Sequence, residues 1–279
     1  MSTSEDYRPF KVMEWEAWQQ RAPHYVDRLG QVTAPAAAHL LDAVQPRIGM
    51  RLLDICCGPG QAAAVASAKG LSVVGIDFAP AMVDEGRRRF PGLDLRIGDA
   101  EALDFTDGSF DAAICAFGLL HLPDAGRGLA EAFRVVKAGG SYAFCVWCAP
   151  DKAKLLGLVM DVVSAHVDKD IALPPGPPFF HFSDPEVSVR ALERAGFRDI
   201  VFRDLPLVYE GPSPEDFLDW FEKSTVRMSA LYRLQTSDVQ ARIRDALLAG
   251  ARCYATQDAV RIPCPAIMFS GRKPACRAA

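Results

Sequence analysis

The sequence predicts an α/β protein whose core is a doubly wound parallel sheet. Short apolar runs alternate with helical patterns between residues 50 and 147, and most of these runs are nearly continuous in apolar residues. Alternating strands and helices favour a parallel sheet, and continuous apolar strands are typical of a sheet that helices cover on both faces. Cysteine and glycine after the first run, and aspartate after the second, indicate that both strands end in turns where a ligand can bind.

The composition is that of a folded globular chain and excludes several classes of protein. Of 279 residues, 50% are hydrophobic and 24% are charged, and the formal net charge is −4. These values exclude a disordered or collagen-like chain. The chain also lacks the excess of basic residues that is typical of nucleic-acid-binding proteins. No apolar run approaches the roughly 20 residues of a membrane span, and the first 20 residues lack a signal-peptide stretch. We therefore expect a cytoplasmic protein, and nothing in the sequence sets its oligomeric state.

The chain has eight cysteines, at positions 56, 57, 115, 145, 148, 253, 264 and 276. Eight are too few for a disulfide scaffold, and several of them lie inside apolar runs. Buried reduced thiols explain this distribution better than disulfides. The adjacent Cys56 and Cys57, and the pair Cys145 and Cys148, lack the second ligand pair of a zinc site. We therefore expect no metal site.

The central part of the chain supplies the predicted sheet and its first helices. The expected strands are residues 50–55, 71–76, 93–97, 110–117 and 141–147, and the expected helices are 61–69, 79–89 and 125–136. A basic last turn in the second of these helices suits the helix dipole. Residues 48–150 are therefore expected to form a ligand-binding core.

The flanking segments differ in character from the core. Residues 1–47 are expected to form a helical flap, with Val12, Trp15, Trp18 and Ala22 recurring at helical spacing. Residues 151–197 and 212–258 are expected to form a cap or lid, which includes a loop rich in proline and phenylalanine at 173–182. Residues 198–211 and 259–273 are expected to supply the last two strands of the core sheet, read as strands at 200–209 and 266–271.

A glycine turn, Gly58-Pro59-Gly60, lies between the first predicted strand and its helix. Glycine lets a ligand approach the main chain, and the helix N-terminus offers free N–H donors. Together with Ala63 the turn matches the dinucleotide pattern G-x-G-x-x-A, and Asp77 closes the next strand as a ribose-binding acid would. A dinucleotide-dependent oxidoreductase is therefore one open interpretation.

Two further acids favour a different adenosine ligand. Asp54 lies four residues before Gly58, where a carboxylate would repel a pyrophosphate but could pair with a cationic amino group. Asp99 follows the third predicted strand, where it could accept from the exocyclic amine of an adenine. A ligand with a cationic amino-acid end, a ribose and an adenine suits all three carboxylates. S-adenosylmethionine is such a ligand.

Four segments resemble the ordered motifs of class I S-adenosylmethionine-dependent methyltransferases with a methyltransferase type 11 domain. They are LLDICCGPG (52–60), GIDFAPAMV (75–83), GDAEALDFTDGSFDAAIC (98–115) and VVKAGGSYAF (135–144). The phrasing is similar to the ubiquinone/menaquinone-biosynthesis methyltransferases. The resemblance implies a Rossmann-like seven-stranded sheet with a terminal antiparallel strand and a helical cap inserted after the fifth strand. Cys56 departs from the family, which usually has the first glycine of its motif there.

The resemblance implies cofactor-binding roles for Tyr25, Asp54, Cys56, Gly58, Gly60, Asp77, Phe78, Met82, Asp99, Ala100, Ala116 and Phe117. In this interpretation Asp54 orients the turn and the amino-acid end, and the Gly58 backbone carries part of the ligand. Asp77 accepts from the ribose hydroxyls. Phe78 and Met82 pack on the adenine, although Met82 could equally be part of the core.

The remaining implied roles concern the far ends of the cofactor. Asp99 and the Ala100 N–H would bind the adenine edge, and Ala116 and Phe117 would flank the sulfonium. Tyr25 matches the aromatic residue of the family's N-terminal flap, although it could belong to an ordinary aromatic stripe.

His121 lies just past the fourth strand and is the candidate general base, with a packed ring as the alternative. A base is needed only if the acceptor must lose a proton. The cap region is aromatic, which suits a small, partly apolar or aromatic acceptor or an ordinary core, through Trp147, Phe179, Phe180, Phe182, Phe217, Trp220 and Phe221. We expect the N-terminal helix with Trp15, Trp18 and Tyr25, and the loop 173–182, to close over the cofactor. A non-catalytic cofactor-binding partner subunit is a third interpretation.

Overall fold

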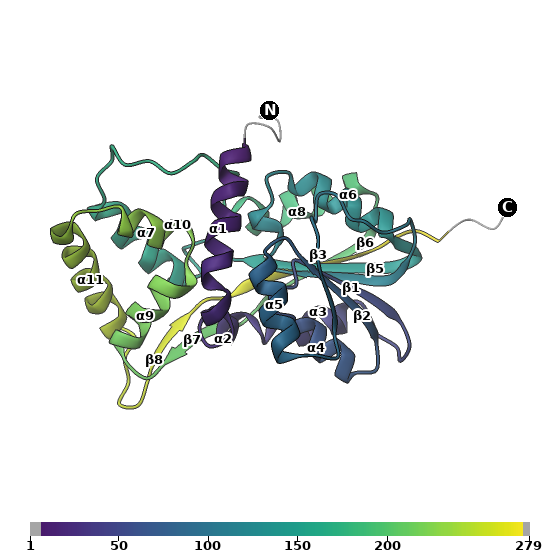
Figure 1. Ribbon diagram of the computed structural model, residues 1–279, viewed down its shortest axis with the longest axis horizontal. Coiled ribbons are helices and arrows are strands. Elements are labelled where there is room, and N and C mark those ends of the chain that lie inside the picture. Colours follow the sequence, from purple (N-terminus) through teal and green to yellow (C-terminus); the bar gives the residue numbers. More distant parts are fainter. Residues whose placement is uncertain (1–6, 276–279) are drawn as a thin grey trace.

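The computed structural model describes residues 7–275 of the 279, so residues 1–6 of the predicted flap and Cys276 lie outside the described part. Seven of the strands within residues 7–275 form one sheet in the order β3-β2-β1-β4-β5-β9-β6 (Figure 1). Their bounds are β1 (Arg51–Ile55), β2 (Ser72–Asp77), β3 (Asp94–Ile97), β4 (Phe110–Ala116), β5 (Val136–Trp147), β6 (Arg198–Leu205) and β9 (Ala266–Arg272).

The direction of the strands matches the predicted fold class. The first five strands pair in parallel, and β9 is antiparallel to both of its neighbours, β5 and β6. The prediction of a doubly wound, seven-stranded sheet with a terminal antiparallel strand is therefore confirmed. The parallel order places the carboxyl ends of β1, β2 and β4 together at one edge, where open α/β sheets bind their ligands.

The two predicted terminal strand regions are each divided, which corrects the predicted bounds. Residues 198–211 form β6 and then β7 (Val208–Gly211), and residues 259–273 form β8 (Val260–Pro263) and then β9. β7 and β8 leave the core sheet and pair with each other in a separate antiparallel ribbon. Pro206 and Pro265 lie at the two divisions, and proline lacks the N–H that a continuous ladder requires.

Five helices pack on the sheet: α3 (Ala36–Ala43), α4 (Gln61–Ala68), α5 (Pro80–Arg89), α6 (Ala125–Val135) and α8 (Pro185–Ala195). In Figure 1, α3 and α4 lie on one side of the sheet, and α6 and α8 lie together on the other. The sequence predicted residues 185–195 to lie in the cap, and this prediction is wrong. α8 packs on α6, β6 and β9 because it buries Leu192 on the sheet side.

The cap consists of helices grouped beyond the β7–β8 ribbon, on the opposite side of the molecule from β1 to β3 (Figure 1). They are α7 (Lys154–His166), α9 (Pro214–Ser224), α10 (Arg227–Arg233) and α11 (Ser237–Arg252). The short α10 is not among the predicted helices. The loop between α7 and α8 carries a 3-10 turn, η3 (His181–Ser183), and no other regular structure within the described residues.

The N-terminal helix α1 (Arg8–Tyr25), followed by α2 (Leu29–Thr33), stands between the core and the cap (Figure 1). It packs against α5 of the core and α9 of the cap. Arg21 connects α1 to the cap. The guanidinium of Arg21 donates hydrogen bonds to the Thr225 carbonyl and, at 2.7 Å, to Ser229 Oγ. None of the helices within residues 7–275 is long and apolar enough to cross a membrane.

Candidate active site

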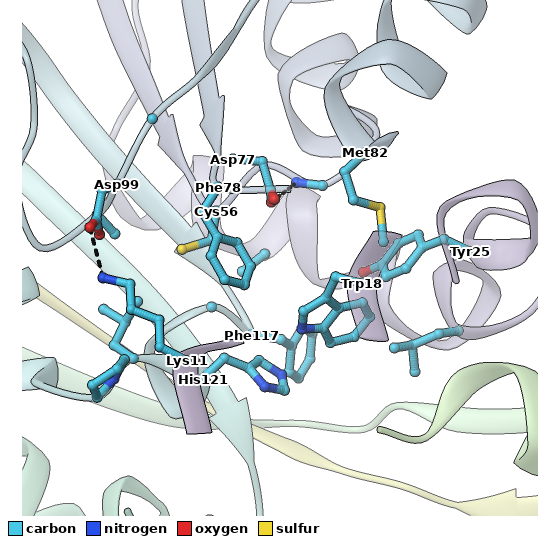
Figure 2. Close-up of a pocket in the computed structure, with 18 of the residues that line it drawn as sticks. Lys11, Trp18, Tyr25, Cys56, Asp77, Phe78, Met82, Asp99, Phe117 and His121 are labelled. Atoms are coloured by element: carbon cyan, nitrogen blue, oxygen red, sulfur yellow. Dashed lines mark hydrogen bonds and ion pairs between the residues drawn. The ribbon is translucent and has the colours of Figure 1, made fainter. Parts of the chain in front are cut away.

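A cavity of about 770 Å³ opens at the carboxyl ends of β1, β2 and β4, and side chains of α1 also line it (Figure 2). Ten of the twelve predicted cofactor residues line it, which are Tyr25, Cys56, Gly58, Asp77, Phe78, Met82, Asp99, Ala100, Ala116 and Phe117. His121 lines it as well. Asp54 and Gly60 do not. We call this space the strand-end cavity.

Asp77 ends β2 and holds the glycine turn in place. Its Oδ2 accepts from the Gly58 N–H at 2.9 Å, and its Oδ1 accepts from the Ala79 N–H at 2.9 Å. Only 7% of the residue is exposed. Burial raises the pKa of Asp77 to about 6, and the backbone donors partly oppose that rise. The carboxylate therefore couples the end of β2 to the turn after β1.

Asp54 lies in β1 and is 1% exposed. Neither of its carboxylate oxygens has a hydrogen-bond partner among the residues that the structure describes. Burial raises the pKa of Asp54 to about 7, and the nearby Ala63 backbone only partly opposes this. Asp54 lines a smaller cavity of about 370 Å³, which shares Tyr25, Cys56 and Ala116 with the strand-end cavity. A buried carboxylate without a partner is suited to a cationic group.

Gly60 positions the turn without lining the strand-end cavity. It caps the N-terminus of α4 with a φ of +79°, a conformation that favours glycine. A Cβ there would lie 3.0 Å from Leu95 Cδ1.

Two strand ends hold residues other than glycine in the left-handed region. Cys56 after β1 has a φ of 56°, and Phe117 after β4 has a φ of 57°. Such conformations store strain and cluster at functional sites. Gly118 lets the turn after β4 approach Cys56 closely, because a Cβ at position 118 would lie 2.4 Å from the Cys56 Cβ. Phe117 stacks on Trp147 with ring centroids 4.1 Å apart.

An apolar group stands at one end of the strand-end cavity, where Figure 2 shows Trp18, Tyr25 and Met82 side by side. Met82 is buried and also lines the cavity. Its position is therefore compatible with a core residue and with a residue that contacts the cofactor. The Trp18 and Tyr25 rings meet edge to face with centroids 6.1 Å apart. Burial raises the pKa of Tyr25 to about 12, so the phenol stays protonated at neutral pH.

The buried face of α1 matches the predicted spacing only in part. Trp18 and Ala22 are buried as expected, whereas Val12 is 51% and Trp15 40% exposed. Trp15 lines neither the strand-end cavity nor the smaller one beside Asp54. The buried face also carries Glu14 and Arg21, which the apolar spacing could not indicate because both side chains are ionisable.

At the other end of the cavity, Lys11 of α1 approaches Asp99 (Figure 2). Its Nζ lies 2.7 Å from Asp99 Oδ2 and 2.5 Å from Glu101 Oε2. Burial opposes the charge, but the hydrogen bonds to Asp99 and Glu101 raise the pKa of Lys11 overall. The second oxygen of Asp99 accepts from the Glu101 N–H at 2.9 Å. Lys11 was not among the sequence candidates.

His121 ends the 3-10 turn η2 (Leu119–His121) and is paired with a buried acid. Its Nδ1 lies 2.9 Å from Glu14 Oε2, and the indole of Trp18 donates to the same oxygen at 3.2 Å. Glu14 is 2% exposed. The ring of Trp18 also meets the imidazole edge to face, with centroids 5.1 Å apart. Glu14 lies 107 residues from His121 and carried no signal in the sequence.

A second cavity of about 1,080 Å³ lies on the cap side of the same wall. It shares Trp18, Leu29, His121 and Trp147 with the strand-end cavity. Its further lining comes from α1, α7, the loop before η3, α9 and α10, and it includes Phe179, Phe180 and Trp220 from the predicted aromatic set. We call it the cap cavity. Phe182, Phe217 and Phe221 line neither cavity, and the last two are fully buried core residues.

The comparisons with known proteins agree with this arrangement. The family model described as "Methyltransferase domain" matches residues 53–144. The demethylmenaquinone methyltransferase of Beutenbergia cavernae is 34% identical over 176 residues, which are 59% of this chain and 72% of that protein. The enzyme of the same name from Renibacterium salmoninarum is 40% identical over 111 residues, which are 40% of this chain and 47% of that protein.

The chain belongs to the class I S-adenosylmethionine-dependent methyltransferases.

Solved structures share the fold of this methyltransferase. A putative methyltransferase from Bacillus halodurans has a TM-score of 0.54 at 19% identity, over 86% of this chain and 99% of that one. The phosphoethanolamine N-methyltransferase 2 of Haemonchus contortus, solved with S-adenosyl-L-methionine, has a TM-score of 0.52 at 18% identity. That match covers 86% of this chain and 52% of the other. The methyltransferase uses S-adenosylmethionine, and the dinucleotide and non-catalytic interpretations gain no support.

Proposed function

We propose that this methyltransferase acts on a small aromatic acceptor with an ionisable hydroxyl, such as a quinol, bound in the cap cavity. One observation carries the proposal: His121 lines both cavities, and its Nδ1 lies 2.9 Å from the buried Glu14 carboxylate. The imidazole therefore stands between the cofactor's proposed space and a second, largely apolar space. Two relatives are named demethylmenaquinone methyltransferase, which supports a quinone-type ring.

On the cofactor side, the proposal assigns the polar ends of S-adenosylmethionine to the carboxylates. The unpartnered, buried Asp54 receives the cationic amino group, with Tyr25 and Cys56 sharing that smaller cavity. Asp77 receives the ribose hydroxyls while it holds the Gly58 N–H. When bound, the cofactor supplies a methyl group already activated by a sulfonium.

The adenine and the sulfonium take the remaining lining residues. Phe78 and Met82 offer apolar surface to the adenine faces, and Asp99 and Ala100 stand at its edge. A carboxylate oxygen has two lone pairs, so Asp99 can keep Lys11 and still accept a further hydrogen bond. The remaining assignments place Ala116 and Phe117 near the sulfonium, with Gly58 and Gly60 shaping the turn.

In this proposal His121 is the general base that accepts the proton of the acceptor's hydroxyl. A carboxylate at Nδ1 holds the N–H there, which leaves the lone pair of Nε2 free to accept. The hydroxyl proton of the acceptor passes to Nε2, and the resulting phenolate shares its charge between oxygen and the adjacent ring carbon. The same proton transfer therefore prepares either atom for methylation. After methylation at oxygen the imidazolium releases its proton to solvent; after methylation at carbon that carbon loses its hydrogen as a proton to solvent, and the imidazolium returns its proton to the oxygen. The apolar walls keep water from this charge and from the methyl donor.

Transfer of a labelled methyl group tests the acceptor class. The panel is 1,4-naphthoquinol and 1,4-benzoquinol, kept reduced, with phosphoethanolamine and bulk transfer RNA as non-quinol contrasts. We expect label in the quinols alone, and mass spectrometry of the product then distinguishes a methylated oxygen from a methylated carbon. Label in phosphoethanolamine or RNA, or in none of the four, would contradict the proposal. The absence of a nucleic-acid partner and a cytoplasmic location stay predictions from the sequence.

A further inference from the structure

The helix α9 presents two polar side chains to the cap cavity. Trp220 and Ser224 are four residues apart, so they lie on the same face, one turn from each other. Both line the cap cavity, and neither lines the strand-end cavity. They therefore stand on the cap wall, away from the wall that His121 shares with the cofactor's space.

Both polar atoms are buried without a partner. Trp220 is 2% exposed and Ser224 is 4% exposed. Among the residues that the structure describes, neither the Trp220 Nε1 nor the Ser224 Oγ has a hydrogen-bond partner. Buried polar groups in folded proteins are nearly always paired, and each exception calls for an explanation. Two exceptions on adjacent turns of one helix face, in one cavity, share a single explanation.

Polar side chains next to these two residues do have hydrogen-bond partners. Thr225, the next residue, donates its hydroxyl to the Phe221 carbonyl at 2.9 Å, as helical Ser and Thr side chains commonly do. Trp18, which also lines this cavity, donates its indole N–H to Glu14. Ser224 does not bond back to its own helix, and no acceptor among the described residues receives the N–H of Trp220. Both donors are left for a ligand.

We propose that Trp220 and Ser224 form a subsite for an uncharged oxygen of the acceptor, a carbonyl or a second hydroxyl. An indole N–H and a serine hydroxyl can donate together to the two lone pairs of one oxygen. This inference rests on the proposed function, because it places one oxygen of the acceptor at His121 and another at α9. It adds a requirement: the acceptor carries two oxygens on opposite sides of a planar, apolar body.

Arg227 also lines the cap cavity and would favour a carboxylate instead. Its guanidinium already donates to the Pro174 carbonyl at 3.0 Å and lies 5.8 Å from the centre of the Phe10 ring. The groups left without partners are the neutral donors of α9. The subsite therefore selects a neutral oxygen rather than an anion.

A matched pair of probes tests the subsite: 1,4-naphthoquinol, with two oxygens, and 1-naphthol, with one. Binding is measured by calorimetry on the protein loaded with S-adenosylhomocysteine, under anaerobic conditions, and methyl transfer is measured in parallel. We expect the two-oxygen probe to bind roughly tenfold to a hundredfold more tightly, since a hydrogen-bonding site rejects the analogue that leaves its donors unpaired. Trp220→Phe and Ser224→Ala should each remove most of that difference and leave 1-naphthol binding unchanged.

Two exposed positions supply matched controls. Trp15→Phe on α1 and Ser164→Ala on α7 make the same chemical changes where neither cavity is lined, and they should preserve the preference. Ser224→Ala removes a single oxygen, so it remains informative if Trp220→Phe loosens the stack of Trp220 on Phe217. Thermal melting reports the folding of each variant.

The outcomes separate this inference from the proposed function. A two-oxygen preference in binding that both α9 variants abolish, without methyl transfer to either probe, would support the subsite and contradict the proposed acceptor chemistry. Methyl transfer with equal binding of the two probes, or with a preference that both variants retain, would overturn the subsite alone. Failure of both probes to bind would overturn the subsite.

Discussion

The two cavities on either side of His121 are built in different ways. The strand-end cavity is made from turns that directly follow β1, β2, β3 and β4, and its carboxylates, Asp77 and Asp99, lie at the ends of neighbouring strands. The cap cavity is made from side chains of α1, α7, α9 and α10, and most of its lining is apolar or aromatic. In the proposed function, recognition of the cofactor would therefore depend on backbone geometry, whereas recognition of the acceptor would depend on how separate helices pack.

This difference predicts that the two functions can be damaged separately. The shared wall is the exception, because Trp18, His121 and Trp147 serve both sides. Variants on each side of the wall, and in the wall itself, test the division.

The largest effect is expected in the wall. His121→Gln should lower the rate of methyl transfer to 1,4-naphthoquinol by about 10²- to 10⁴-fold, the usual contribution of a general base. Glu14→Gln should lower it less, because the amide still accepts from Trp18 and from the imidazole. Single-turnover rates with labelled cofactor measure both. Affinity for S-adenosylhomocysteine should stay within about threefold in His121→Gln, and a loss of affinity as large as the loss of rate would show that the ring mainly supports the cofactor.

The unpartnered Asp54 predicts a dependence of stability on pH in the ligand-free protein. Its pKa is raised from 3.8 to about 7 and that of Asp77 to about 6, so the folded state retains protons that the unfolded chain has lost. The stabilising contribution is complete below pH 3.8 and is lost as the pH rises through 6 to 7. For Asp54 the loss has an upper limit of about 4 kcal/mol, since each pKa unit corresponds to about 1.4 kcal/mol.

Urea unfolding at pH 5 and pH 8 measures this contribution. Asp54→Asn should flatten the decline, because an amide does not ionise. Added S-adenosylmethionine should also flatten it, because a bound ammonium group stabilises the ionised carboxylate. A decline that Asp54→Asn leaves unchanged would place the titrating group elsewhere.

A smaller loss is expected from Asp77→Ala on the cofactor side. Charge-assisted hydrogen bonds contribute about 1.5–3 kcal/mol each, so affinity for S-adenosylhomocysteine should fall roughly tenfold or more. The Asp111→Asn variant is the matched control. That carboxylate also accepts from a backbone N–H, of Arg51 at 2.8 Å, but it lies near the start of β4, at the opposite edge of the sheet. Unchanged affinity in a folded Asp77→Ala protein would reject the ribose assignment.

The smallest effect is expected from the ion pairs that join α1 to the loop after β3. Lys11→Met removes contacts to Asp99 and Glu101 that are only partly buried, so affinity for S-adenosylhomocysteine should change by no more than about fivefold. Hydrogen exchange of α1 should rise in the ligand-free protein and fall again on binding. Lys69→Met, which removes an exposed pair with Asp42, should leave α1 unchanged. Equal protection of α1 with and without ligand would contradict the predicted closing of the flap.

Much of the strand-end cavity could be predicted because its determinants are local. A strand, a glycine turn and a helix follow one another within about ten residues, and parallel strands bring successive turns to one edge. Asp77 and Gly58 meet in the structure at 2.9 Å for this reason. The order of the apolar runs was likewise sufficient to predict a doubly wound parallel sheet, and the family resemblance implied its seven strands and its terminal antiparallel strand. The prolines at 206 and 265 could have indicated where the last two strand regions divide.

What only the tertiary structure decided concerns contacts between distant segments. Glu14 and Lys11 reach partners 107 and 88 residues away, and this depends on which face α1 turns inward. Periodicity of apolar residues identified only part of the buried face, Trp18 and Ala22. It missed the charged side chains of that face, whose partners come from η2, the loop after β3 and the cap. The sequence offered Trp220 only as one of the cap aromatics and did not single out Ser224. Their buried polar atoms without partners became visible only in the folded chain. The sequence by itself thus determined the sheet and the cofactor's turns through short-range backbone geometry. Side-chain burial between remote helices decided the cap cavity, where we propose that the acceptor binds.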